Sequence, residues 1–416
     1  MNLLIKNAIL NGKKRDILIS NGIFTRIDQK IEDPSAEIIN AENKIIVPSL
    51  KNGHTHAAMA PLRGFGDDTK LQPWLEEKIW PAEANITPED AYWGTRFAVL
   101  EMIKSGTTFC NDMYFHFGMT QKAFIDSGIK SAAGPALFDF FNKEKAENMK
   151  KNCLYDIANT EHSKKNSLFL AAHSIYTLSK ESLLWIAKLS KEKNIPVHIH
   201  LSETEFEVNE CIKNYGIRPA KLLEQTGLLE TELIAAHSIW LDDSELDLMA
   251  KNNVTVVYNP SSNMKLATGG VFPYSKIKDR KIRILLGTDS CASNNNLDMF
   301  EEMKFAALLQ KFHNNNPELM SAESIFNIAT GSDASIFPQL SSEIKVGALA
   351  DCLLLDQNTP ELVPSHNLIS NLVYSANGSC VDTVICDGEI LMKNRRVKDE
   401  EEITDHIRSI AEKIIV

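Results

Sequence analysis

The sequence predicts an α/β protein: a (β/α)8 TIM-like barrel with a small β-sandwich domain formed by both chain termini. The central part of the 416-residue chain alternates short apolar runs with segments of helical periodicity. Near-continuous apolar runs are typical of parallel strands covered on both faces. Both chain ends instead show short strand-like segments joined by tight turns. We therefore expect a composite domain at 1–47 and 340–416, which includes a C-terminal helix, and a barrel at 48–339.

The terminal segments have the features of hairpins. NLLIKNAIL and DILISNGIFTRI are punctuated by Asn11-Gly12 and Asn21-Gly22, and Asn-Gly pairs favour two-residue turns between antiparallel strands. Near the other end, VDTVICDGEILMKNRRV contains the turn pair Asp387-Gly388 and follows the strand-like ADCLLLDQ. The last segment, EEITDHIRSIAEKIIV, has helical spacing. Two strand-rich flanks around a long middle indicate one small domain built from both ends.

Eight apolar runs mark the strands of the central part, and eight βα units indicate a barrel. Helical patterns such as PEDAYWGTRFAVLEMIKSG and SKESLLWIAKLSKEKN lie between them, the second with Ser179 as its N-cap. The runs are IIVPSL, TTFCND, KSAAGPAL, LFLAAH, PVHIHL, LIAAH, VTVVYNP and RILLGTD.

The composition is that of an ordinary globular protein, with 44% hydrophobic and 24% charged residues. A formal net charge of −11 disfavours nucleic acids and anionic membranes as partners. The seven cysteines form no C-x-x-C pair and are expected to be reduced, as in a cytoplasmic protein. The N-terminal segment lacks the apolar core of a signal peptide, and no apolar run is long enough to span a membrane. The oligomeric state stays open, and a homo-oligomer is compatible with these features.

Histidines gather where the apolar runs end. Active sites of such barrels form at the carboxyl ends of the strands, and alternate residues of a strand share a face. His54 and His56 can thus chelate one cation. His200 and Asp289 could complete the set of ligands around it. Imidazoles and a carboxylate suit Zn²⁺ or another divalent first-row metal. A lone H-x-H arises by chance, and a strand-end histidine is usually only hydrogen-bonded. However, five of the 11 histidines lie at predicted strand ends: His54, His56, His173, His200 and His237.

Several motifs resemble the amidohydrolase superfamily, and more narrowly the 5-methylthioadenosine/S-adenosylhomocysteine deaminases and the related triazine chlorohydrolases. The motifs are HTHAAMAPLRGFGDD, LEEKIWPAE, HLSETEFEV, AAHSIWL and GTDSCASNNNLDMF. The resemblance covers nearly the whole chain. It implies a TIM-like barrel with a β-sandwich from both termini, and a metal-dependent hydrolase that acts on a small nucleoside or heterocycle.

The resemblance also implies which residues bind the metal. The ligand in VHIHLSE is the histidine three residues before the glutamate, which makes the set His54, His56, His200 and Asp289. His198 lies deeper on the same strand, and we expect it to support the ligands. Relatives with two metals carry a modified lysine on the fourth strand, and LFLAAHS contains none. We therefore expect one Zn²⁺, or another divalent first-row metal such as Fe²⁺, per subunit.

The implied reaction is hydrolytic deamination of an adenine ring. Asp289 accepts a proton from the water that the metal activates. Glu203 protonates a ring nitrogen, and burial would raise its pKa in the required direction. His237 holds the attacking oxygen. By spacing alone, Glu203 reads as a helix-terminal acid, and only the resemblance favours catalysis.

Four residues have weaker claims to contact the substrate. Glu83 matches a position that contacts ribose, and His173 one that contacts the nucleoside. Ser293 is a candidate for the purine ring and Trp74 for the apolar part of the pocket. The alternatives are a helix acid, a core histidine, a loop serine and a core tryptophan, respectively.

The substrate itself is less certain. Relatives that bind a homocysteine carboxylate use arginines after the third strand, where GPALFDFFNKEKAENMK has only lysines. This favours methylthioadenosine, 5′-deoxyadenosine or adenosine over S-adenosylhomocysteine. The main alternative is a chlorohydrolase or aminohydrolase of triazine, guanine or another N-heterocycle. A non-enzymatic scaffold would lack ligands, and all four are present.

Overall fold

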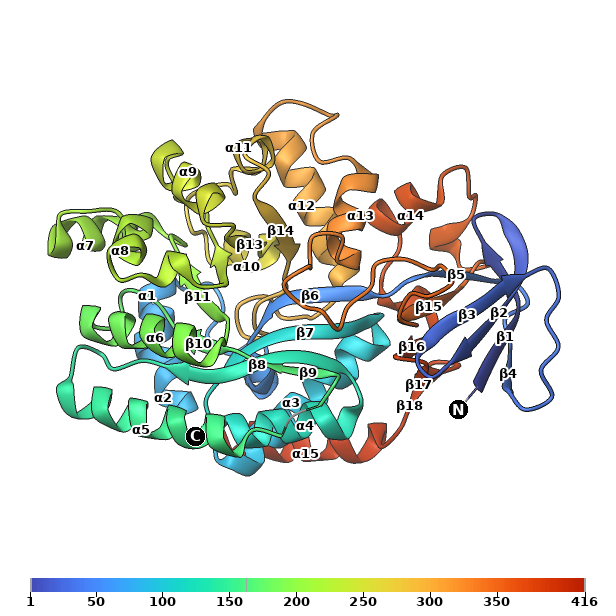
Figure 1. Cartoon of the computed structure of the whole chain (residues 1–416), viewed down its shortest axis with the longest axis horizontal. Coiled ribbons are helices and arrows are strands. Elements are labelled where there is room, and N and C mark those ends of the chain that lie inside the picture. Colours follow the sequence, from blue (N-terminus) through green and yellow to red (C-terminus); the bar gives the residue numbers. More distant parts are fainter. Residues whose placement is uncertain (1, 162, 415–416) are drawn as a thin grey trace.

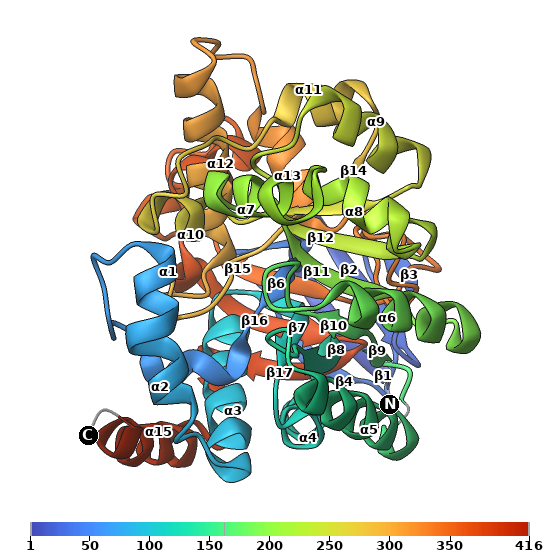
Figure 2. The same ribbon diagram turned by 90° about the vertical axis from the view of Figure 1, so that its left-hand side faces the viewer.

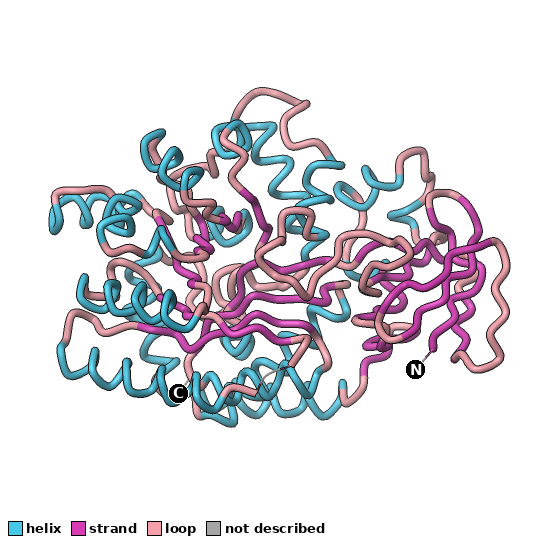
Figure 3. The backbone as a smooth tube through the Cα atoms, viewed as in Figure 1, coloured by secondary structure: helices cyan, strands magenta, loops and turns pink. Residues whose placement is uncertain are grey.

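The computed structural model describes residues 2–161 and 163–414, which form two sheets surrounded by helices (Figure 1). One sheet is parallel and comes from the middle of the chain, and the other combines strands of both ends. Coloured by secondary structure, one group of strands lies in the middle of the molecule among the helices, and the other lies at the right-hand end (Figure 3). The expected barrel with a β domain from both termini is confirmed.

The terminal sheet joins both chain ends through the antiparallel pair β5–β15. Its turns are those expected from the sequence: Leu10 pairs with Lys13 across Asn11-Gly12, whose φ angles of 49° and 74° suit these two residue types. The order is β18-β17-β16-β15-β5-β1-β2-β3, with β4 on β1. The strands are β1 (Asn2–Leu10), β2 (Lys13–Ser20), β3 (Ile23–Asp28), β4 (Glu37–Asn40), β5 (Lys44–Pro48), β15 (Cys352–Asp356), β16 (Val381–Cys386), β17 (Glu389–Lys393) and β18 (Arg396–Val397).

The barrel strands follow chain order around the parallel sheet, β6-β7-β8-β10-β11-β12-β13-β14, and β9 pairs in parallel with the first half of β8. The two ends of this sheet meet where the Asp289 amide donates to the His54 carbonyl oxygen over 3.0 Å. The strands are β6 (Leu50–Thr55), β7 (Thr107–Tyr114), β8 (Lys130–Leu137), β9 (Asn166–Leu168), β10 (Leu170–Ala172), β11 (Val197–Leu201), β12 (Leu233–His237), β13 (Thr255–Tyr258) and β14 (Arg283–Leu286).

The prediction of IIVPSL as the first barrel strand is wrong, because most of this run forms β5 of the terminal sheet. The first barrel strand is instead LKNGHT, whose six residues are all buried. Its polar residues find partners: the Lys51 ammonium donates to Ser49 Oγ at 2.6 Å and Thr108 Oγ1 at 3.0 Å. A Cβ on Gly53 would lie 2.8 Å from Leu285 Cβ, so the barrel interior needs glycine there. Hydrophobicity alone could not reveal such a strand.

Helices surround the barrel, and two predicted ones begin at recognisable caps. Thr87 and Asp90 form a capping box at α3, and Ser179 accepts from the Ser182 amide at α6. None of the described helices combines the length and apolar character needed to cross a bilayer. The main helices are α3 (Pro88–Lys104), α4 (Phe117–Ser127), α5 (Lys143–Asn159), α6 (Lys180–Lys193), α7 (Glu205–Tyr215), α8 (Pro219–Gln225), α9 (Asp243–Lys251), α10 (Pro260–Lys265), α11 (Tyr274–Asp279), α12 (Met299–His313), α13 (Ala322–Thr330) and α14 (Leu368–Tyr374).

Two further helical segments matter for the site. A continuous insertion, α1 (Leu71–Pro73), the π-helical Trp74–Ile79 and α2 (Trp80–Glu83), lies at the end of the barrel away from the terminal sheet (Figure 2). The last helix, α15 (Glu400–Ile414), packs on α3 of the barrel, where His406 stacks on Trp93 at 3.7 Å between ring centroids. The expected domain boundaries at 47/48 and 339/340 stay a prediction.

A buried charge cluster joins the terminal sheet to the barrel. Asp351, just before β15, lies 2.8 Å from the Lys130 ammonium of β8 and 3.8 Å from the Lys51 ammonium of β6. The three side chains are at most 2% exposed. Burial raises the pKa of Asp351, but the charges of both lysines outweigh it and the pKa is lowered. Both buried lysines, at the amino ends of their strands, thus share the Asp351 carboxylate, and the Asp387 carboxylate lies 3.7 Å from Lys130.

Removal of the Asp351 carboxylate should destabilise the fold, because the buried Lys51 would lose its counter-charge and Lys130 would keep only the Asp387 carboxylate, 3.7 Å away. We expect Asp351→Asn to lower the free energy of unfolding by about 3–5 kcal/mol, measured by urea denaturation. Asp405→Asn is the matched control, since its ion pair with Arg408 is exposed and such pairs contribute little. Equal denaturation midpoints for the two variants would contradict the proposed role of Asp351.

Candidate metal centre and active site

The predicted site residues come together at the carboxyl end of the barrel. They surround a cavity of about 560 Å³, whose outer wall is the α1–α2 insertion. His54 is fully buried beneath the cavity floor. The other nine predicted residues line the cavity: His56, Trp74, Glu83, His173, His200, Glu203, His237, Asp289 and Ser293.

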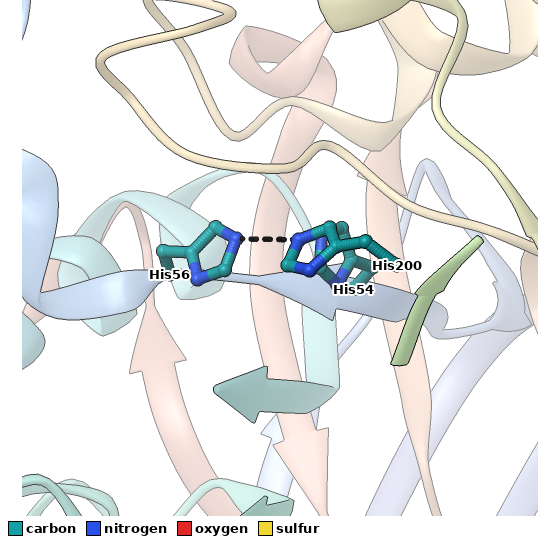
Figure 4. A group of neighbouring side chains, drawn as sticks. All are labelled: His54, His56 and His200. Atoms are coloured by element: carbon teal, nitrogen blue, oxygen red, sulfur yellow. Dashed lines mark hydrogen bonds between the residues drawn. The ribbon is translucent and has the colours of Figure 1, made fainter. Parts of the chain in front are cut away.

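Backbone carbonyls fix the protonation of two histidines. His56 Nδ1 donates to the Met113 carbonyl and His200 Nδ1 to the His173 carbonyl, each over 2.7 Å. Each proton therefore sits on Nδ1 and leaves a lone pair on Nε2. The two Nε2 atoms face each other at 3.2 Å, the pair joined by the dashed line in Figure 4. Two acceptor nitrogens this close need a cation between them.

His54 and Asp289 complete the same centre. His54 Nε2 is buried with no hydrogen-bond partner among the described residues. It lies 3.5 Å from Asp289 Oδ1, and His56 Nε2 lies 3.4 Å from the same oxygen. A tetrahedral Zn²⁺ with ligand bonds of about 2.0–2.1 Å separates its ligand atoms by roughly 3.3 Å. The spacing and the orphaned nitrogen therefore fit a divalent cation. Burial also lowers the pKa of His54 and His200, which favours the neutral imidazoles that metals bind.

The remaining atoms of these ligands are held by neighbours. His198 Nε2 lies 3.0 Å from His54 Nδ1, and the Asn111 amide lies 3.2 Å from the other nitrogen of His198. This places His198 behind the ligands, as expected. The Ser262 hydroxyl donates to Asp289 Oδ2 over 2.6 Å. With Oδ2 bonded to Ser262, Oδ1 of Asp289 is directed at the histidines.

Glu203 and His237 lie side by side at the ends of β11 and β12, with Glu203 Oε1 3.7 Å from His237 Nδ1. The Asn263 amide donates to His237 Nδ1 over 2.9 Å, so the imidazole proton sits on Nε2. Burial, together with the charges of Asp289 and Glu207, raises the pKa of Glu203 well above its usual value. The Glu203 carboxyl is thus suited to donate a proton, and His237 Nε2 to donate a hydrogen bond.

The insertion contributes Glu83 and Trp74 to the wall that faces these groups. Burial raises the pKa of Glu83 to about 7, against the effects of the nearby Tyr114 hydroxyl and His56. His173 Nδ1 is hydrogen-bonded by the hydroxyls of Ser174 and Thr177, at 3.1 and 3.0 Å. The structure thus brings all the weaker candidates to one cavity but does not test their roles.

Sequence reasoning missed the residues that orient this site. Ser262 and Asn263 lie in NPSSN, at the start of α10 just after the seventh barrel strand. The search for polar residues at strand ends, which identified the histidines, could therefore have identified them as well. Nothing in the sequence pattern identified Glu207. Its carboxylate accepts the backbone amides of Ser202 at 2.8 Å and Glu203 at 2.9 Å, contacts that depend on the fold of the β11–α7 turn.

Comparisons with known proteins found a matching family and several similar proteins. The model of the amidohydrolase family matches residues 45–391. The chain is 43% identical to the 5′-deoxyadenosine deaminase of Methanoregula boonei, over 99% of this chain and 98% of the relative. It is 43% identical to 5-methylthioadenosine/S-adenosylhomocysteine deaminase 1 of Archaeoglobus fulgidus, over 96% and 95%. Among solved structures, an adenosine deaminase from Xanthomonas campestris with bound zinc matches with a TM-score of 0.90, at 29% identity over 100% of this chain and 98% of that one.

The metal centre can be tested by its metal content alone. We expect His200→Ala to lose most of its zinc during dialysis against a mild chelator, because one of four ligands is gone. His366→Ala, at an exposed position, should retain zinc like the unaltered protein. Zinc would be measured by atomic emission spectroscopy. Equal retention by both variants would show that His200 is not a ligand.

Proposed function

Since the chain belongs to the amidohydrolase family, we propose that it hydrolytically deaminates the adenine ring of a nucleoside, releasing ammonia and the inosine analogue. The observation that carries this proposal is a buried Glu203 with a raised pKa that lies beside His237, next to a group of side chains that could hold a metal. The names of the two deaminase relatives support the same reaction. Candidate substrates are 5-methylthioadenosine, S-adenosylhomocysteine, 5′-deoxyadenosine and adenosine.

His54, His56, His200 and Asp289 would hold one Zn²⁺, or another divalent first-row metal such as Fe²⁺, per subunit. A metal ion in such a site lowers the pKa of a bound water to about 7 and so supplies the nucleophile. Two groups of side chains are close enough to hold a cation: His54 with His56 and His200, and His54 with His237 and Asp289. Because both groups include His54, they support a single centre.

Each of three side chains in the site would then carry out one part of the proton transfer. Asp289 Oδ1 accepts a proton from the attacking water, while Ser262 holds Oδ2. His237 donates its Nε2 proton in a hydrogen bond to the oxygen that joins C6 of the adenine. Glu203 gives its proton to a ring nitrogen. As the C6–N bond breaks, the proton held by Asp289 passes to the leaving amino group, and Glu203 takes the proton of the C6 hydroxyl. One water and one adenine thus yield one hypoxanthine and one ammonia.

The remaining candidates would position the nucleoside. Glu83 is assigned to the ribose, His173 to the nucleoside, Ser293 to the purine and Trp74 to the apolar wall. A cavity of about 560 Å³ is within the usual range for small-molecule sites.

The alternative is a chlorohydrolase or aminohydrolase of a triazine, guanine or another N-heterocycle. A buried carboxyl with a raised pKa at Glu203 favours deamination, because ammonia needs a proton to leave and chloride does not. Turnover of chlorinated triazines without turnover of adenine nucleosides would favour the alternative. A cytoplasmic location, the absence of nucleic-acid partners and the formation of a homo-oligomer stay predictions.

The reaction and the proton donor can be tested together. We expect the zinc-loaded protein to release ammonia from 5′-deoxyadenosine or 5-methylthioadenosine. Glu203→Gln should retain zinc but lose about 10²–10⁴-fold in kcat, since an amide cannot supply the proton. Ammonia release and zinc content are the measurements.

Glu205→Gln is the matched control, because this acid lies two residues away but is exposed. It should leave both zinc and turnover unchanged. A Glu203→Gln variant that deaminates at the rate of Glu205→Gln would refute the assignment of Glu203.

A further inference from the structure

Aromatic side chains form the part of the cavity next to Glu83, the residue assigned to the ribose. Phe138 and Phe140 follow β8, and Trp80 belongs to the same short helix as Glu83. The ring centroids of Phe140 and Trp80 lie 5.4 Å apart with the planes at 76°, and those of Phe140 and Phe138 lie 5.2 Å apart. We call these three residues the aromatic wall. Its edge-to-face packing joins the insertion to the loop after β8.

The loop that carries Phe140 is held in an unusual conformation. Phe140 and Phe141 both have left-handed backbones, with φ angles of 47° and 58°, which cost free energy in non-glycine residues. The fully buried Asp139 holds this loop by accepting the Phe141 amide at 2.7 Å and the Ser179 hydroxyl at 2.6 Å. The Phe140 amide donates to the Thr177 carbonyl over 2.9 Å. The position of the Phe140 ring is therefore set by the fold.

Charge is distributed unevenly around this wall. No lysine or arginine occurs among the described residues that line the cavity, whose acidic groups include Glu83 and Glu203. A second cavity of about 350 Å³ shares five lining residues with the first, including Phe138 and Phe140, and holds Lys145. The Lys145 ammonium lies 5.0 Å from the centre of the Phe140 ring. Phe140 thus lines both cavities, and Lys145, a cation that could pair with a substrate carboxylate, lines only the second.

We propose that the aromatic wall, and Phe140 in particular, selects adenine nucleosides with a small uncharged 5′ substituent and disfavours those with a charged tail. This inference rests on the proposed function. A methyl or methylthio group gains from contact with aromatic rings. An amino-acid tail would lose its hydration without a partner for its carboxylate. The proposal assigns a specificity role to residues that do not take part in the chemistry.

The experiment compares kcat/KM for 5-methylthioadenosine and S-adenosylhomocysteine in four proteins. We expect the unaltered enzyme to favour 5-methylthioadenosine by about tenfold or more. Phe140→Ala should reduce this ratio by about tenfold, mainly through KM, because it opens a way to Lys145. The double variant Phe140→Ala/Lys145→Ala should lose the gain for S-adenosylhomocysteine. Phe141→Ala is the matched control, since Phe141 shares the loop and its backbone strain but lines neither cavity.

The outcomes separate this inference from the proposed function. Equal kcat/KM values for both nucleosides in the unaltered enzyme would overturn the inference and leave the deaminase function standing. The inference would also be wrong if Phe140→Ala kept the ratio of Phe141→Ala. If Phe140→Ala does not fold, Phe138→Ala makes the same test. Absence of ammonia from every adenine nucleoside would refute the proposed function, and the inference with it.

Discussion

The site depends on a repulsion that only a cation can relieve. His56 and His200 each give the Nδ1 proton to a backbone carbonyl, so their Nε2 lone pairs face each other at 3.2 Å. The carbonyls belong to the ends of β7 and β10, which the barrel holds rigidly. Neither ring can turn away without loss of its hydrogen bond. The hydrogen bonds of the fold therefore hold the two lone pairs where a bound metal ion would stabilise them.

Backbone strain directs the other reactive groups to the same centre. His237 and Asp289 both have left-handed backbones, with φ angles of 68° and 63°, and Ser202 beside Glu203 has a φ of 49°. Each strained position ends or follows a parallel strand, where the chain must turn outward while the side chain stays inward. Such conformations persist only where the surrounding structure fixes them. Their location at three strand ends explains why these side chains converge on one centre.

The sequence could predict which residues share this end of the barrel, because histidines and acids stand out where apolar runs stop. It could not predict β6, since LKNGHT looks polar and is buried only through specific partners for Lys51 and the lack of a side chain at Gly53. The aromatic wall could not be predicted from the sequence either. Phe140 lines the cavity because Asp139 holds its loop in a strained, left-handed conformation. No local sequence pattern predicts such a conformation.

Buried glutamates that touch no substrate explain how the strained turns are held. Glu207 accepts two backbone amides at the turn that carries Glu203. Glu302, which is fully buried, accepts the Ser261 amide at 3.2 Å beside the serine that binds Asp289. Burial raises the pKa of Glu207 to about 7 and of Glu302 to about 8, so each carboxyl is kept at a cost in solvation. That cost is explained if each carboxyl fixes a turn, Glu207 the turn that carries Glu203 and Glu302 the turn that places Ser262 against Asp289.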